Sequence, residues 1–194
     1  MLGEPILVVA RLVASLDELA IPYVVGGSLA SSVYGIPRAT QDVDLVADLE
    51  LDQVDAFTAS LVADFYVDAG MIIDAIKRRA SFNVVHLATM YKADIFVKQG
   101  DSWSRGQFTR ARLEQFEVDE RTVAIRFSSP EDTLLHKLIW YKLGNEISDR
   151  QWGDVLGVIK VQGQLLDNVY LDTWADALDV VGLLGRARRE VGGA

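Results

Sequence analysis

The sequence predicts a chain that begins as an α/β domain, with a small mixed sheet flanked by helices, and ends as a helical bundle. As far as residue 128, short apolar stretches with the two-residue period of β-strands alternate with longer helical stretches. From residue 129 onwards the periodic segments are helical. We therefore expect one α+β domain over residues 1–128 and a second domain of about four helices over residues 129–194.

The composition is that of a globular protein without thiol chemistry. The 194 residues are 50% hydrophobic and 24% charged, and they include no cysteine, which excludes disulfides, thiolate metal sites and cysteine nucleophiles. No apolar run approaches the roughly 18 residues of a membrane span, and the N-terminus lacks the basic region of a signal peptide. We expect a cytoplasmic protein with no membrane partner. The formal net charge of −9 disfavours broad nucleic-acid binding but leaves room for a local basic patch.

A glycine turn stands between the first predicted strand and the next helix. Residues 23–25 form a short apolar stretch, Gly26 and Gly27 interrupt it, and a helical pattern follows Ser28 over residues 29–34. A helix that starts directly after a strand and a glycine turn presents backbone N–H groups and a positive dipole end to a phosphate. We expect the backbone at Gly26 and Gly27 to approach a nucleotide closely, with Ser28 offering an N–H and a hydroxyl.

Two further predicted strands carry carboxylates. In residues 42–46, Asp42 and Asp44 point to one face of the strand because side chains alternate along it. In residues 92–97, Asp94 lies between apolar neighbours, so its carboxylate must be paired, metal-bound or directed into a cleft. Two carboxylates on one strand face beside a phosphate cradle are what a Mg²⁺–nucleotide site requires.

Two pairs of alternating segments have the pattern of β-hairpins. Residues 82–87 and 92–97 form the first predicted pair. Residues 114–118 and 122–127 form the second, joined by a turn at residues 119–121. These hairpins would complete the sheet of the first domain.

The second domain opens with clear helix-start signals. Ser129 is a predicted N-cap with Pro130 at the first helical position and acidic residues after it. Ser148 and Gln151 have the spacing of a capping box, in which each side chain bonds the other residue's backbone N–H.

The glycine turn and the acid pair together resemble the signature of the polymerase-β-like nucleotidyltransferase superfamily. Gly27 and Ser28 are followed, after thirteen residues, by Asp42-x-Asp44 between apolar residues. The superfamily carries a third carboxylate on a later strand, and Asp94 matches that place. The resemblance covers residues 20–97 at the level of motifs, and it implies that residues 1–128 form a nucleotidyltransferase-like catalytic domain.

The resemblance also implies a reaction. An acceptor hydroxyl attacks the α-phosphate of a nucleoside triphosphate such as ATP in line, and diphosphate leaves; the protein mainly positions the groups and stabilises charge. By match, Asp42, Asp44 and Asp94 are the catalytic residues and the ligands of Mg²⁺. Asp94 would also help to deprotonate the acceptor. Gly26, Gly27 and Ser28 would bind the nucleotide.

A looser resemblance covers the C-terminal helices. Residues 131–138 and 148–155 are similar to the lysine-then-aspartate pattern of the nucleotidyltransferase toxins of type IV toxin–antitoxin and abortive-infection systems. The match implies that Lys137 contacts nucleotide phosphate and that Asp154 lies near the site. Arg38 is a further candidate for phosphate. The alternatives are that Lys137 is an ordinary flanking lysine and that Asp154 is solvated or pairs with Arg150.

The leading interpretation is a Mg²⁺-dependent nucleotidyltransferase that moves a nucleoside monophosphate to a hydroxyl on an RNA or tRNA end or on a protein, with a toxin-like role. One alternative is an antibiotic-type enzyme with a small-molecule acceptor. The alternative from another class is a non-catalytic module that binds a nucleotide or a partner protein.

Overall fold

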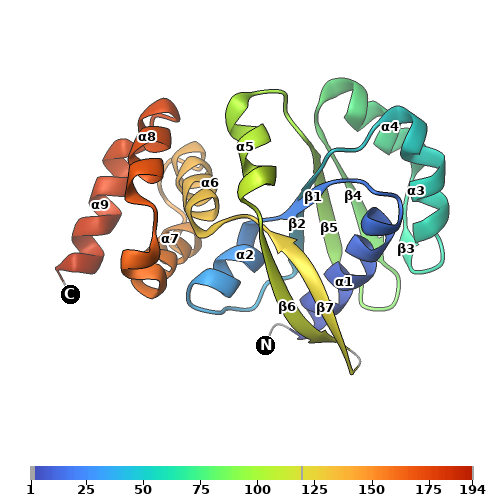
Figure 1. Ribbon diagram of the computed structural model, residues 1–194, viewed down its shortest axis with the longest axis horizontal. Helices are drawn as coiled ribbons and strands as arrows, with labels where there is room; N and C mark the ends of the chain where they lie inside the picture. Colours follow the sequence, from blue (N-terminus) through green and yellow to red (C-terminus); the bar gives the residue numbers. More distant parts are fainter. Residues whose placement is uncertain (1–2, 119, 194) are drawn as a thin grey trace. The chain divides into compact units, whose positions relative to one another are not determined.

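The computed structural model describes residues 3–118 and 120–193 (Figure 1). Residue 119, which we expected in the turn of the second hairpin, lies outside the described residues. The chain divides into two compact units. The sheet unit contains residues 1–29 and 39–127, and the helical unit contains residues 30–38 and 128–194. Residues 30–38 thus group with the C-terminal helices, although in sequence they precede most of the sheet.

The sheet unit is built on a mixed sheet in the order β3-β4-β5-β2-β1-β7-β6. Strands β2 and β5 pair in parallel, as do β1 and β7, and the remaining neighbours are antiparallel. The predicted mixed sheet is therefore confirmed, with seven strands among the described residues. They are β1 (Tyr23–Val25), β2 (Asp42–Ala47), β3 (Phe65–Tyr66), β4 (Ser81–His86), β5 (Lys92–Val97), β6 (Arg112–Val118) and β7 (Arg121–Phe127).

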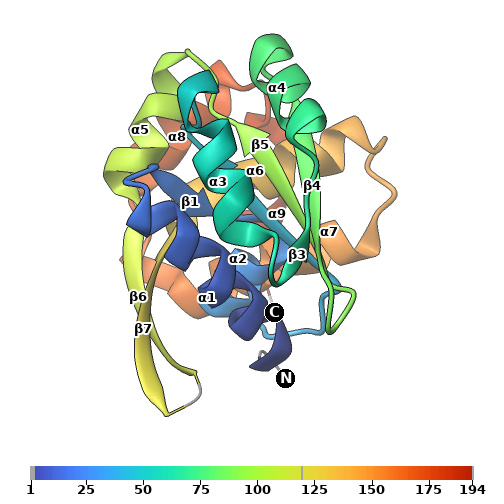
Figure 2. The same ribbon diagram turned by 90° about the vertical axis from the view of Figure 1, so that its right-hand side faces the viewer.

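A layer of helices packs on one face of this sheet. Helix α1 contacts β2, β6 and β7, α4 contacts β4, and α3 lies between α1 and α4, in front of the sheet in Figure 2. The helical elements of the sheet unit are α1 (Gly3–Glu18), the first residues of α2 (Gly27–Tyr34), the 3-10 turn η1 (Leu51–Gln53), α3 (Val54–Leu61), α4 (Ala69–Arg78) and α5 (Ser102–Arg110).

The three strands β4, β5 and β2 are buried on one face only. Alternate residues along each strand are buried, while those between them are partly or fully exposed. Each buried Val, Leu or Ile side chain stabilises the fold by about 1.5–3 kcal/mol relative to exposure. The buried face thus fixes the sheet, and its other face is left accessible. The side chains that are buried on these strands include Val43, Leu45, Ala47, Phe82, Val84, Ala93, Ile95 and Val97.

The helical unit is a bundle of four α-helices among its described C-terminal residues, as the sequence predicted. Helix α6 contacts α7 and α8, and α9 contacts α7 and α8. No helix within residues 3–118 and 120–193 is long and apolar enough to cross a membrane. The C-terminal elements are α6 (Pro130–Leu143), α7 (Asp149–Gln162), the 3-10 turn η2 (Gly163–Leu165), α8 (Asn168–Ala177) and α9 (Val181–Gly192).

The predicted start of α6 is confirmed, whereas only the N-cap part of the capping box predicted for α7 is present. Ser129 Oγ accepts the N–H of Asp132 at 3.1 Å, with Pro130 in the first turn of α6. Ser148 Oγ accepts the N–H of Gln151 at 3.3 Å. The reciprocal bond of a capping box is absent, because Gln151 Oε1 is buried without a hydrogen-bond partner among the described residues. Ser148 is thus a simple N-cap.

Within the helical unit, the turn that follows α2 packs backbone to backbone on α7. A Cβ added to Gly35 would lie 2.8 Å from the backbone N of Val158, and one added to Gly157 would lie 3.2 Å from the N of Ile36. Gln162 Nε2 also donates to the Tyr34 carbonyl O at 2.8 Å. Glycine at 35 and 157 is what allows this approach.

We predict that Gly35→Ala destabilises the protein, because the added methyl group meets backbone atoms that cannot rotate away. Overpacking of this kind costs about 1–3 kcal/mol, which lowers the melting temperature by about 2–4 °C per kcal/mol in a chain of this size. The control is Gly153→Ala on α7, where a Cβ meets nothing within 4 Å. It should raise stability slightly through helix propensity. Equal melting temperatures for the two variants would contradict the packing argument.

Candidate active site

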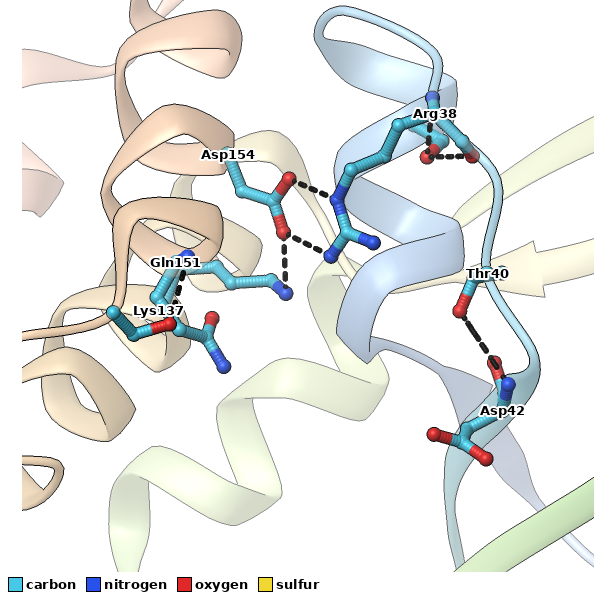
Figure 3. A network of polar contacts seen from close by, with 8 residues as sticks. Arg38, Thr40, Asp42, Lys137, Gln151 and Asp154 are labelled. Atoms are coloured by element: carbon cyan, nitrogen blue, oxygen red, sulfur yellow. Dashed lines mark hydrogen bonds and ion pairs between the residues drawn. The ribbon is translucent and has the colours of Figure 1, made fainter.

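The pairing of β2 with β5 brings the predicted carboxylates together. In this parallel pair, Asp42 lies opposite Lys92 and Asp44 lies directly opposite Asp94. All four belong to the accessible face of the sheet; the Asp94 side chain is 25% exposed. Thr40 Oγ1 donates to the Asp42 carbonyl O at 3.0 Å, which holds the backbone where β2 begins (Figure 3). Acids that are fifty residues apart in sequence thus share one patch of the sheet.

The glycine turn packs directly against one of these acids. Gly26 N–H donates to the Asp44 carbonyl O at 2.8 Å. Gly27 is left-handed, with φ +58°, and a Cβ there would lie 1.9 Å from Asp44 Oδ2. The structure therefore requires glycine at 27 for a reason that the sequence did not reveal: the Asp44 carboxylate lies where a side chain would be. Ser28 follows as the second residue of α2.

Sequence reasoning missed Lys92. Its Nζ lies 2.7 Å from Asp94 Oδ2. The hydrogen bond to Asp94, together with attraction from Asp94, Asp42 and Asp44, raises the pKa of Lys92. A signal for this residue was present, since a lysine two positions before a strand aspartate lies on the same face.

The donor chemistry of this patch suits a hard divalent cation, since Mg²⁺ is bound through carboxylate oxygens. Asp42 and Asp44 share a face, and Asp44 is beside Asp94. Within residues 3–118 and 120–193, however, no three His, Cys, Asp or Glu side chains gather into a metal-binding group. Asp42 and Asp44 supply the oxygen donors that such an ion prefers, whereas Asp94 is paired with Lys92 in this arrangement.

A cavity of about 230 Å³ in the sheet unit does not belong to this patch. Asp48, which follows β2, and Lys98, which follows β5, both line it. They lie at the far ends of the two strands from Asp42 and Lys92. Asp48 is four residues beyond Asp44, or roughly 13 Å along an extended strand. The cavity and the acid patch are therefore separate features of the sheet unit.

In the helical unit, Lys137 and Asp154, which were predicted from one motif, form an ion cluster with Arg38, which was predicted independently. Arg38 donates to both carboxylate oxygens of Asp154, from Nε to Oδ1 at 2.7 Å and from one terminal nitrogen to Oδ2 at 2.8 Å. Lys137 Nζ lies 2.7 Å from Asp154 Oδ2 (Figure 3). The alternatives for Asp154, a solvated carboxylate or a partner of Arg150, are wrong because its side chain is only 5% exposed and bound to these two cations.

Burial and charge oppose each other in this ion cluster. Burial alone would raise the pKa of Asp154, but the hydrogen bonds and charges of Arg38 and Lys137 lower it overall. The hydrogen bond to Asp154 raises the pKa of Arg38. Lys137 is as buried as Asp154, while 31% of the Arg38 side chain is exposed. The formal charge of the three side chains together is +1.

We predict that Gly27→Ala distorts the acid patch. The methyl group would overlap the Asp44 carboxylate, and a left-handed backbone disfavours alanine. The variant should lose about 1–3 kcal/mol of stability, as expected for a strained backbone position. The matched control is Gly26→Ala, where a Cβ meets nothing within 4 Å. Urea unfolding of both variants gives the comparison, and a Gly27→Ala protein as stable as Gly26→Ala would contradict the assigned contact.

We predict a second loss of stability for Asp154→Ala, because it leaves Arg38 and the buried Lys137 without their carboxylate. Removing one partner of a buried ion pair costs about 3–5 kcal/mol, and we expect the lower end because Arg38 is partly exposed. The control is Asp172→Ala in the same unit. Asp172 is 59% exposed and pairs with Arg188, so its loss should cost at most about 1 kcal/mol. Similar urea midpoints for both variants would overturn this reading of the ion cluster.

Comparison with known proteins places the fold. No protein-family model and no curated protein sequence matches this chain. Among solved structures, it is similar to an antigenic nucleotidyltransferase-like protein from Paracoccidioides brasiliensis, with a TM-score of 0.54 and 20% identity over 93% of this chain and 89% of that chain.

Two structures of the antibiotic-resistance factor ANT(2'')-Ia are also similar. The complex with adenylyl-2''-tobramycin has a TM-score of 0.51 and 10% identity over 89% of this chain and 95% of that chain. The solution structure has a TM-score of 0.50 and 10% identity over 92% of this chain and 95% of that chain. The chain therefore has the nucleotidyltransferase fold of these proteins, as its resemblance to the polymerase-β-like superfamily implied.

Proposed function

We propose that the protein is a nucleotidyltransferase that depends on a divalent cation such as Mg²⁺. It would move a nucleoside monophosphate from a nucleoside triphosphate to an acceptor hydroxyl and release diphosphate. The observation that carries the proposal is the register of β2 and β5, which sets Asp44 beside Asp94 on an accessible sheet face. The packing of the Gly27 turn on Asp44 supports it, because the nucleotide-binding motif and the acid patch are then one structure.

Residues of the sheet unit would take different roles in the proposed reaction. Asp42 and Asp44 would bind the cation, which when bound supplies positive charge to the phosphates. Asp94 would complete the patch and accept the proton of the acceptor hydroxyl. The Gly26 amide is already used by the Asp44 carbonyl, so its part is to hold the turn. Gly27 and Ser28, at the start of α2, are the proposed contacts to phosphate.

The ion cluster of the helical unit is proposed to bind phosphate as well. Arg38 and Lys137 supply the charge, and Asp154 fixes their positions by binding both head groups. This arrangement suits an anion because two cations share one carboxylate. Lysine acts as a point charge and arginine as a planar donor, and the Arg38 side chain is the more exposed of the two, at 31% against 5% for Lys137.

The acceptor class has two candidates. The looser resemblance to toxin nucleotidyltransferases favours an RNA or tRNA end or a protein hydroxyl. The similarity to ANT(2'')-Ia, solved in complex with adenylyl-2''-tobramycin, favours a small-molecule hydroxyl. The net charge of −9 makes extended RNA contact less favourable. Incubation with each α-labelled triphosphate, Mg²⁺ and either cell extract or purified aminoglycosides would separate the candidates by which material becomes labelled.

We predict that Asp44→Asn lowers the transfer rate by at least about 100-fold, the scale of losing one preorganised charged or polar group in an active site. The fold should survive, because an accessible sheet face contributes little to the core. The measurements are labelled-nucleotide turnover and calorimetric binding of ATP with Mg²⁺. Asp48→Asn is the control, since Asp48 pairs with Lys98 away from the acid patch.

Unchanged turnover in Asp44→Asn would exclude the acid patch as the active site. Nucleotide binding by the unaltered protein without transfer to any acceptor would instead favour the non-catalytic binding module.

A further inference from the structure

Lys92 places a positive charge inside the acid patch. Strands β2 and β5 each contribute two charged side chains to the accessible face, with Lys92 opposite Asp42 and Asp94 opposite Asp44. Neighbouring strands are about 4.8 Å apart, and residues i and i+2 on a strand are about 6.6 Å apart. Lys92 is therefore next to two of the three carboxylates, and its Nζ binds Asp94 at 2.7 Å.

The ion pair between Lys98 and Asp48 gives a comparison for the ion pair between Lys92 and Asp94. Lys98 follows β5, and its Nζ lies 2.6 Å from Asp48 Oδ2 in the segment after β2, whereas Lys92 binds an acid of its own strand. The partner of Lys92 differs because it lies beside a second acid, Asp44, in direct register. Removing the charge of Lys92 would therefore change the charge of the acid patch. Removing the charge of Lys98 would affect only Asp48, which lies outside the patch.

We propose that Lys92 is a built-in counter-ion that competes with a divalent cation for Asp94. This inference rests on the proposed function, since it concerns the same acid patch. In the metal-free protein, the ammonium group neutralises Asp94 and limits the repulsion between Asp94 and Asp44. A divalent cation held by Asp42 and Asp44 gains Asp94 only when Lys92 releases it.

The side chain of Lys92 is suited to such an exchange. It is 43% exposed, so its ammonium can move into solvent without uncovering the core. Lysine is a strongly hydrated point charge on a flexible stem, and it does not grip a carboxylate with the two parallel bonds that arginine forms. Lys92 thus pairs with Asp94 in the structure and can release it when a competing cation binds.

The test measures Mn²⁺ binding to the full chain by calorimetry and by electron paramagnetic resonance, without nucleotide and without turnover. Lys92→Met should bind Mn²⁺ about threefold to tenfold more tightly than the unaltered protein, because a nearby positive charge is removed. Lys92→Gln tests the same loss with a polar side chain, should the methionine variant fold poorly. Lys92→Arg keeps the charge and should not gain affinity. Lys98→Met is the matched control and should bind Mn²⁺ like the unaltered protein.

Thermal melting provides a second test of the counter-ion role of Lys92. In EDTA, Lys92→Met should melt below the unaltered protein, and Mn²⁺ should raise its melting temperature by more than it raises that of the unaltered protein. If Mn²⁺ binds the unaltered protein and is lost in Asp44→Asn, but both charge-removing variants of Lys92 bind it no more tightly, the counter-ion role is wrong and the proposed function stands. If no variant binds Mn²⁺, both are wrong.

Discussion

The register between β2 and β5 is the constraint on which the acid patch depends. Side chains alternate along both strands, so a slip of one residue in either strand would turn its acids into the core. The buried side chains of Val43, Leu45 and Ile95 oppose that slip, because each would have to leave the core. The positions of the carboxylates are thus set by apolar residues that take no part in the chemistry.

Both units place like charges close together and balance them with a side chain of the opposite charge. In the sheet unit, Lys92 pairs with Asp94 on a sheet face that also carries Asp42 and Asp44. In the helical unit, Arg38 and Lys137 both bind the carboxylate of Asp154.

Sequence periodicity predicted β2, β4 and β5 because burial alternates along them, and it placed Asp42, Asp44 and Asp94 on these strands. The fully buried β1 was predicted as a short apolar stretch. Helix α5 was missed, since residues 102–110 are polar and lack an apolar stripe; its one local signal is the cap, where Asp101 Oδ1 accepts the N–H of Ser104 at 2.9 Å. The bond between Arg38 and Asp154 spans 116 residues, and no local pattern encodes such a partner. The contact of Gly27 with Asp44 is hidden for the same reason.

Burial decides what a substitution in each cluster can reveal. The acids of β2 lie on an accessible face, so replacing one removes a charge while the buried side of the strand keeps its packing. A loss of activity there reflects chemistry or ligand binding. Asp154 and Lys137 are buried and hold each other, so a substitution changes stability and the position of the remaining charge together. Activity lost in the helical unit therefore gains meaning only beside the free energy of unfolding of the same variant, whereas the acid patch can be studied by activity and metal affinity alone.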